Sequence, residues 1–216
     1  DLFRCGILNA HGGDLPRYRG NACQAWAILN GETRIGLCVH KMIGGELDSG
    51  DIITRAYMPI EPNTKVTAAW AWMESQVPAL MREAVDQLAE DSEYVLERQS
   101  KNRRDALRCY PRRPEDGRID WTYSALQTLR LINASNKPYP GAFCEFEGNR
   151  MTIWDAELSD DDEQFLAVPG QVTLISETYI DVACGEGKLR INTVQIADQP
   201  ECAPTTFVTS SRQRLL

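Results

Sequence analysis

A charged segment with two prolines, residues 97–118, most strongly constrains how this chain can fold. It reads ERQSKNRRDALRCYPRRPEDGR, and the sequence patterns on its two sides differ. The residues before it contain a long periodic segment and a few strand-like runs, whereas the residues after it contain several short apolar runs separated by turn residues. We therefore expect residues 97–118 to link two domains, residues 1–96 and residues 119–216.

The clearest element of the first part is a helix over residues 64–90. Apolar residues recur there at three- and four-residue spacing, as on one face of a helix. Thr64 is a candidate cap, and Pro78 could kink or divide the helix. Shorter elements are expected as well: a buried strand at 2–8, a helix at 21–30 capped by Asn21, and strands at 34–43 and 52–60.

Residues 119–216 have the pattern of a small, mostly β domain, a barrel or a sandwich. The acidic run at 160–163 could suggest calcium ligands, but it lacks the glycine and terminal glutamate of a calcium loop, so we favour a solvated hairpin tip. The expected elements are a helix around 124–134 and strands near 142–147, 150–156, 171–175, 179–183 and 188–196.

Charge and cysteine content limit the classes of function. The net charge is -8, from 23 basic and 31 acidic residues, which argues against a large nucleic-acid surface but still allows a small anionic ligand. No apolar run is long enough to span a bilayer, so we expect no membrane partner. The seven cysteines contain no CxxC pair, which indicates reduced thiols in a cytoplasmic protein and no zinc knuckle.

Asn9, His11 and Asp48 are the candidates for catalysis. Asn9 and His11 are two residues apart near the end of the first expected strand, so both side chains can face one ligand, and Asp48 lies in a glycine-rich loop after a later strand. An amide and an imidazole can stabilise the oxyanion of an acyl transfer, and a carboxylate beside the imidazole helps it to move a proton. By residue type alone, a histidine after a strand more often satisfies a local hydrogen bond, Asn9 could cap a loop and Asp48 could serve a turn; we expect a structural role for His40.

An ordered set of motifs across residues 7–60 carries a family resemblance. The stretch resembles formyltransferases that use 10-formyltetrahydrofolate, and two later segments, RRPEDGRIDW (112–121) and NKPYPGAFCEF (136–146), resemble sugar N-formyltransferases, notably the one acting on UDP-4-amino-4-deoxyarabinose. Methionyl-tRNA formyltransferase shares a weaker form of these segments. The motifs are Asn9-x-His11, Leu15-Pro16-x-Tyr18-Arg19-Gly20, Gly31-Glu32, Gly36-x-x-x-His40-x-Met42 and Asp48-x-Gly50.

The resemblance implies an α/β fold: the C-terminal part of a Rossmann-like formyltransferase domain, with its N-terminal strands missing, followed by a small barrel-like β domain. It also implies that Asn9, His11 and Asp48 are catalytic and that the backbone of Gly44, Gly45, Glu46, Leu47 and Asp48 lines the folate pocket. Asn21 stands where relatives often keep a folate-contacting arginine. Arg17 and Arg19 could hold a phosphate or carboxylate or could be solvated, and Asp116 could contact substrate or serve a turn.

The activity that the resemblance implies is transfer of a formyl group from 10-formyltetrahydrofolate, without a metal, to the amine of a nucleotide-linked amino sugar. Relatives are often dimers, so a homodimer is compatible with it. Three alternatives remain open at this point: methionyl-tRNA formyltransferase, hydrolase of 10-formyltetrahydrofolate, and a non-catalytic module with the same fold.

Overall fold

The structure, a computed structural model, describes residue 3, residues 6–161 and residues 163–216. It divides into two compact units, Asp1–Arg112 and Arg113–Leu216, which are described separately. The division falls within the charged segment at 97–118. No helix of the described residues is long and apolar enough to cross a membrane.

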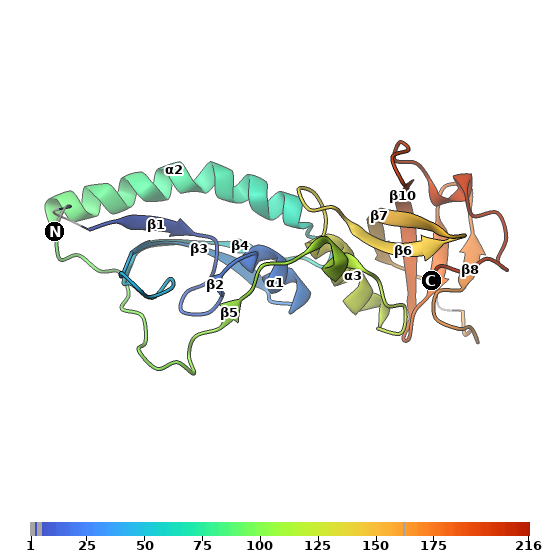
Figure 1. The fold of residues 1–216 in the computed structure, drawn as a ribbon, viewed down its shortest axis with the longest axis horizontal. Helices are drawn as coiled ribbons and strands as arrows, with labels where there is room; N and C mark the ends of the chain where they lie inside the picture. Colours follow the sequence, from blue (N-terminus) through green and yellow to red (C-terminus); the bar gives the residue numbers. More distant parts are fainter. Residues whose placement is uncertain (1–2, 4–5, 162) are drawn as a thin grey trace. The chain divides into compact units, whose positions relative to one another are not determined.

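The first unit contains a three-stranded antiparallel sheet in the order β1-β3-β4 (Figure 1). The strands expected at 34–43 and 52–60 are confirmed as β3 and β4. The first strand begins later than expected, and residues 2, 4 and 5 of the expected range lie outside the described residues. The bounds are β1 Leu8–His11, β3 Arg34–Lys41 and β4 Ile52–Pro59.

Helix α2 (Val66–Glu90) confirms the long expected helix, but two details differ. It continues through Pro78 without a break, and it begins at Val66 with Lys65 in the cap position. Thr64 is not the cap, because its hydroxyl accepts a hydrogen bond from the backbone N–H of Glu61 instead.

Helix α1 (Cys23–Leu29) is shorter than the helix expected at 21–30, and Asn21 does not cap it. Ala22 occupies the cap position in a left-handed conformation, with φ 53°, and makes no side-chain cap bond. The backbone N–H of Asn21 donates instead to the carbonyl of Cys109. This bond continues a short parallel pairing of β2 (Arg19–Gly20) with β5 (Arg108–Cys109).

Apolar and polar side chains alternate along the strands of the first sheet and therefore lie on opposite faces of it. Leu37 and Val39 of β3 pack with Leu80 and Ala84 of α2 in one apolar cluster, and Leu8 and Ala10 of β1 pack against the same cluster. Because successive strand residues point to opposite faces, the residues between them, which include Asn9, His11 and His40, face away from α2. The apolar pattern that anchors α2 therefore turns these polar side chains to the other face.

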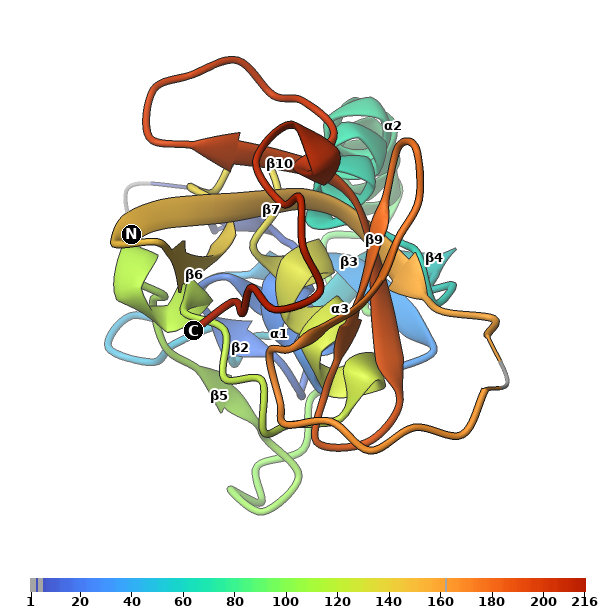
Figure 2. The same cartoon turned by 90° about the vertical axis from the view of Figure 1, so that its right-hand side faces the viewer.

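The second unit contains a five-stranded antiparallel sheet in the order β6-β7-β10-β9-β8, and Figure 2 shows β7, β10 and β9 curving around α3. All five expected strands and the expected helix are confirmed within a few residues. Leu129 and Ile132 of α3 are fully buried in the core. The bounds are η1 Pro114–Gly117, α3 Ala125–Ala134, β6 Ala142–Phe146, β7 Asn149–Leu158, β8 Val172–Ile175, β9 Ile180–Ala183, β10 Lys188–Ile196 and η2 Pro204–Thr206.

Hydrogen bonds from the final residues of the chain join the two sides of this sheet. Leu216 exchanges two backbone hydrogen bonds with Glu145 of β6, and the N–H of Leu215 donates to Gly170, shortly before β8. The acidic run at 160–163 is paired in part: Asp160 lies 2.8 Å from Arg190, and Asp161 forms an ion pair with Lys188. These carboxylates thus neutralise basic residues of β10.

Candidate active site

The register of β1 against β3 brings Asn9 and His40 together. Their Cα atoms are direct partners in the antiparallel pair, and His11 pairs with Cys38 one step further along. The Nδ2 of Asn9 lies 3.3 Å from the Nε2 of His40, and the Nδ1 of His40 donates to the carbonyl of Lys41. His40 is therefore placed to accept a hydrogen bond from the Asn9 amide, and this bond fixes the orientation of the Asn9 side chain.

Asp48 reaches the same place from the loop between β3 and β4. One oxygen of its carboxylate lies 3.6 Å from Nδ1 of His11, and the other lies 3.6 Å from Nε2 of His40. The backbone N–H of Gly20 donates to this carboxylate at 2.8 Å. Asp48 holds its position with a left-handed φ of 45°, a conformation that costs a non-glycine residue free energy and is frequent at functional sites.

Electrostatics favour an ionised Asp48. Burial by itself raises the pKa of a carboxylate, but the contact with His40, the charge of His11 and the Gly20 N–H together hold the pKa of Asp48 below its ordinary value. The carboxylate thus remains negative at neutral pH and can stabilise positive charge that develops on His11.

His11 is buried, and both of its ring nitrogens face protein groups. Its Nε2 donates to the carbonyl of Tyr18 at 2.7 Å, which leaves Nδ1 directed at Asp48. The thiol of Cys23 donates to the same Tyr18 carbonyl at 2.9 Å. Burial lowers the pKa of His11, and the opposing effects of the Tyr18 carbonyl and Asp48 do not restore it. At neutral pH Nδ1 therefore lacks a proton and can act as a base beside a carboxylate.

Gln99 fixes the loop that carries Asp48. Its side-chain N–H groups donate to the carbonyls of Asp48 at 2.9 Å and Gly50 at 2.7 Å. Its carbonyl accepts a hydrogen bond from Arg19 at 2.7 Å. All three polar positions of this buried side chain are thus occupied, so Gln99 connects β2 to the Asp48 loop.

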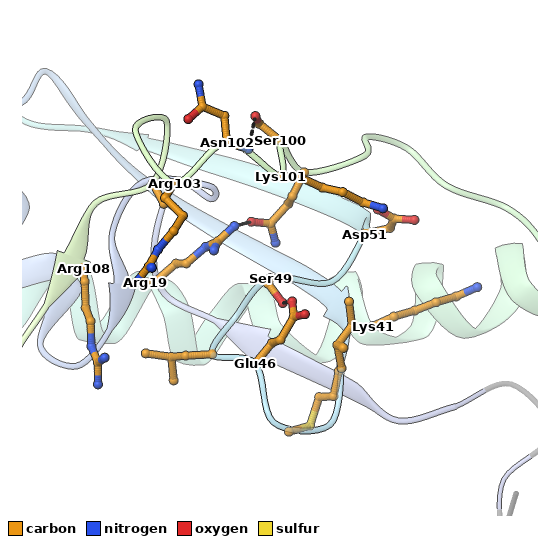
Figure 3. Close-up of a pocket in the computed structure, with 15 residues that line it drawn as sticks. Arg19, Lys41, Glu46, Ser49, Asp51, Ser100, Lys101, Asn102, Arg103 and Arg108 are labelled. Atoms are coloured by element: carbon orange, nitrogen blue, oxygen red, sulfur yellow. Dashed lines mark hydrogen bonds between the residues drawn. The ribbon is translucent and has the colours of Figure 1, made fainter.

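A cavity of about 1000 Å³ lies beside this loop (Figure 3). Glu46 and Leu47 contribute to its lining from the expected folate loop, and Arg19 contributes from β2. Ile43 and Met42 add exposed apolar surface. The cavity therefore combines apolar and strongly basic walls within the first unit.

The remaining predicted residues do not line this cavity. Arg17 pairs with Glu32 at 3.1 Å on the surface, and Asn21 is exposed. Gly44 and Gly45 are exposed in the loop, and a side chain added to either would meet no atom of the described residues within 4 Å. Asp116 lies in the second unit, where its carboxylate accepts a hydrogen bond from the backbone N–H of Arg113.

Sequence reasoning assigned His40 a structural role and did not identify Gln99 or the Tyr18 carbonyl as parts of the site. The spacing of His40 from Asn9 carries no signal until the antiparallel register is known. Gln99 lies in a charged segment that showed no periodicity, so nothing in its sequence context indicated that it would be buried. Across the described part of the chain, no group of three or more His, Cys, Asp or Glu residues is placed to hold a metal ion.

Comparisons with known proteins agree with the motifs. A curated relative, methionyl-tRNA formyltransferase from Geobacter metallireducens, is 29% identical over 215 residues, which cover 98% of this chain and 65% of the relative. The chain thus spans about two thirds of the length of this relative.

Two solved structures share the fold at low sequence identity. HypX from Aquifex aeolicus, in complex with tetrahydrofolic acid, matches with a TM-score of 0.68 and 19% identity over 94% of this chain and 35% of its own. An N-formyltransferase from Helicobacter canadensis matches with a TM-score of 0.66 and 17% identity over 86% of this chain and 65% of its own.

Two family models match the chain in order. The model described as formyl transferase matches residues 1–85, and the model described as formyl transferase, C-terminal domain, matches residues 112–212. Because the two models together match most of the sequence, the chain belongs to the formyl transferase family.

Proposed function

We propose that the protein transfers the formyl group of 10-formyltetrahydrofolate to the amine of a nucleotide-linked amino sugar. The observation that carries the proposal is the convergence of Asn9, His11 and Asp48, with His11 and Asp48 only 3.6 Å apart. These groups can stabilise an oxyanion and move a proton, which are the two tasks of amide formation.

Relatives support both substrates. The related HypX structure is a complex with tetrahydrofolic acid, and the Helicobacter canadensis N-formyltransferase is a complex with folinic acid and dTDP-3-aminofucose. The segments at 112–121 and 136–146 resemble those of sugar N-formyltransferases. The proposal includes the Rossmann-like first domain, the barrel-like second domain and the homodimer that the resemblance implies.

In this mechanism, Asn9 stabilises the tetrahedral intermediate. Its Nδ2 uses one N–H toward His40, and the second N–H has no partner among the described residues. That N–H donates to the formyl oxygen as negative charge develops on it. His40, a residue expected to be structural, then acts as the group that orients Asn9.

His11 accepts the proton that the amine must lose. The amine nitrogen forms a bond to the formyl carbon, and the bond from that carbon to the folate nitrogen breaks. One amine proton passes to Nδ1 of His11, and the same proton then neutralises the departing folate nitrogen. Asp48 and the Tyr18 carbonyl stabilise the imidazolium between these steps, because each faces one of its N–H groups.

The loop at 44–48 binds the folate in this proposal. A flat pterin needs open backbone and apolar surface, and both are present: no atom of the described part of the chain lies within 4 Å of a side chain added at Gly44 or Gly45, and Leu47 is 45% exposed. Asn21 and Arg17 remain candidates for folate and substrate contacts, respectively, on the basis of the resemblance alone.

The test is tetrahydrofolate release from 10-formyltetrahydrofolate in the presence of amino sugars linked to UDP, dTDP or GDP. His11→Asn and Asp48→Asn should each lower kcat by about 100-fold or more, because removal of a positioned acid–base group has an effect of this size. The matched control is Asp86→Asn, which removes an exposed carboxylate from α2 and should leave kcat unchanged. Normal turnover in a folded His11→Asn or Asp48→Asn variant would refute the assignment.

A second candidate, methionyl-tRNA formyltransferase, is favoured by the 29% identity to that enzyme. The acidic composition opposes it, because binding of tRNA phosphates requires clustered positive charge. Formylation of charged initiator tRNA, with no reaction of any amino sugar, would establish this alternative. Release of tetrahydrofolate without an amine would indicate a hydrolase instead.

A further inference from the structure

The cavity beside Asp48 has an excess of positive charge that the catalytic residues do not explain. Its lining includes Glu46 and Asp51 as carboxylates, opposed by basic side chains from three parts of the first unit. The basic residues are Arg19, Lys41, Lys101, Arg103 and Arg108. Such an excess attracts a ligand with more than one negative charge.

Three arginine side chains lie on the same side of the cavity lining. Arg19, Arg103 and Arg108 lie on one side in Figure 3, whereas Lys41, Lys101 and Asp51 lie on the other. None of these three arginines forms an ion pair with a carboxylate in the described part of the chain. The Nε of Arg19 is buried and has no hydrogen-bond partner among the residues that the structure describes.

An unsatisfied buried N–H group costs free energy, so a ligand that accepts its hydrogen bond is stabilised there. Guanidinium groups match the oxygens of phosphoryl groups well, because each can donate two parallel hydrogen bonds. Three of them around one cavity can therefore hold adjacent phosphoryl groups. We infer that Arg19, Arg103 and Arg108 bind the diphosphate group of the acceptor, an inference that rests on the proposed function.

The binding end is connected to the catalytic carboxylate. Arg19 donates to Gln99, and Gln99 donates to the carbonyl of Asp48. A diphosphate bound to Arg19 is therefore linked to the Asp48 loop through one intervening side chain, that of Gln99. The diphosphate binds at one end of the cavity, and the apolar wall of Met42, Ile43 and Leu47 stays available to the folate.

Two neighbouring arginines allow a matched test. Arg103 and Arg104 are both exposed, but Arg103 lines the cavity and Arg104 does not. Calorimetric titration with inorganic pyrophosphate should show affinity lowered about tenfold or more in Arg103→Ala and Arg108→Ala, since each lost charge-assisted contact has an effect of this order. Arg104→Ala, with the same change of net charge, should bind pyrophosphate like the unaltered protein.

A second titration, with p-aminobenzoylglutamate, tests whether the arginines bind the carboxylates of folate instead of the diphosphate of the acceptor. Its affinity should not change in Arg103→Ala or Arg108→Ala; a loss confined to this probe would assign the arginines to the carboxylates of folate and overturn the inference. Equal pyrophosphate affinity in Arg103→Ala, Arg108→Ala and Arg104→Ala would also overturn it.

Turnover measurements distinguish this inference from the proposed function. With a nucleotide-linked amino sugar as acceptor, Arg103→Ala should raise KM for the acceptor about tenfold and change kcat little, because the contact is the same in the ground and transition states. If the variants lose pyrophosphate binding while no amino sugar is formylated, the diphosphate site stands and the proposed function fails.

Discussion

Replacing Gln99 with leucine tests whether this side chain holds the Asp48 loop. The substitution keeps a similar volume but removes the two donors to Asp48 and Gly50 and the acceptor for Arg19. The Gly50 carbonyl is in a buried residue and cannot regain a partner from solvent, whereas Asp48 and Arg19 are partly exposed. With a cost of about 1–3 kcal/mol for the buried group and less for the others, we expect a total destabilisation of about 3 kcal/mol.

Hydrogen exchange of the β3 and β4 amides in increasing urea measures the stability of the first unit without contributions from the second. Gln76→Leu serves as the control, because Gln76 lies on α2 and its side chain bonds only the neighbouring Ser75 among the described residues. The control should remain within about 0.5 kcal/mol of the original protein. A loss below that value in Gln99→Leu would show that the three hydrogen bonds contribute nothing to the loop.

Gln99→Glu separates the contact with Arg19 from the contacts with the loop. The carboxylate still accepts from Arg19, but it places negative charge against two carbonyl oxygens. Its destabilisation should be at least as large as that of leucine at neutral pH and should decrease as the pH falls, because the protonated acid regains one O–H donor. A destabilisation that is independent of pH would contradict this account.

Two further predictions concern ionisation and helix capping. Folding lowers the pKa of His11 from 6.5, so the unfolded chain binds this proton more readily than the folded chain does. The stability that neutral His11 contributes is therefore present above about pH 6.5 and is lost as the pH falls through the pKa of the folded state. Folding also lowers the pKa of Asp48 from 3.8, so the contribution of Asp48 is lost only below about pH 4. NMR titration of His11 should show its midpoint below 6.5, and a midpoint above this value would contradict the dominance of burial. Ser124→Ala removes the side-chain acceptor for the Gln127 N–H at the start of α3, and it should lower the free energy of unfolding in urea by about 1 kcal/mol. The control is Ser100→Ala in the first unit, which removes a hydroxyl that does not lie at the start of a helix.

The second unit could be predicted well from the sequence. Its strands alternate apolar and polar residues and are separated by short turns such as Glu147–Gly148, where both residues have positive φ. In such a pattern the local signals and the tertiary packing agree, so the five strands were located correctly. The pairing of the chain terminus with Glu145 could not be predicted, because it joins segments about 70 residues apart and depends on the curvature of the whole sheet.

Local propensity failed at the ends of the helices in the first unit. Asn21 and Thr64 are good cap residues in isolation, yet the backbone around Asn21 is committed to pairing with Cys109, and Thr64 closes its own turn with Glu61. Pro78 could remain inside α2 because packing of residues such as Leu80 and Ala84 against the sheet outweighs the loss of one helical hydrogen bond.

The candidate site was predictable only in part. The Asn9–His11 spacing and the glycine-rich context of Asp48 indicated that these side chains could meet, and the structure places His11 beside Asp48 and Asn9 beside His40, which also contacts Asp48. The geometry that gives them their chemistry depends on contacts distant in sequence: the Tyr18 carbonyl that fixes the His11 ring, and the Gln99 amide that holds the loop. Neither contact follows from residue type alone.

The pairing of β1 with β3 has a consequence for how this site tolerates change. His11 reaches Asp48, and Asn9 reaches His40, only because odd positions of the four-residue edge strand β1 point away from α2. Insertion or deletion of a single residue just before Leu8 that shifted β1 by one position would exchange the two faces, turning Leu8 and Ala10 toward Asp48 and burying the imidazole among apolar side chains. The site should therefore tolerate conservative apolar substitutions at Leu8 and Ala10 more readily than an insertion or deletion just before β1.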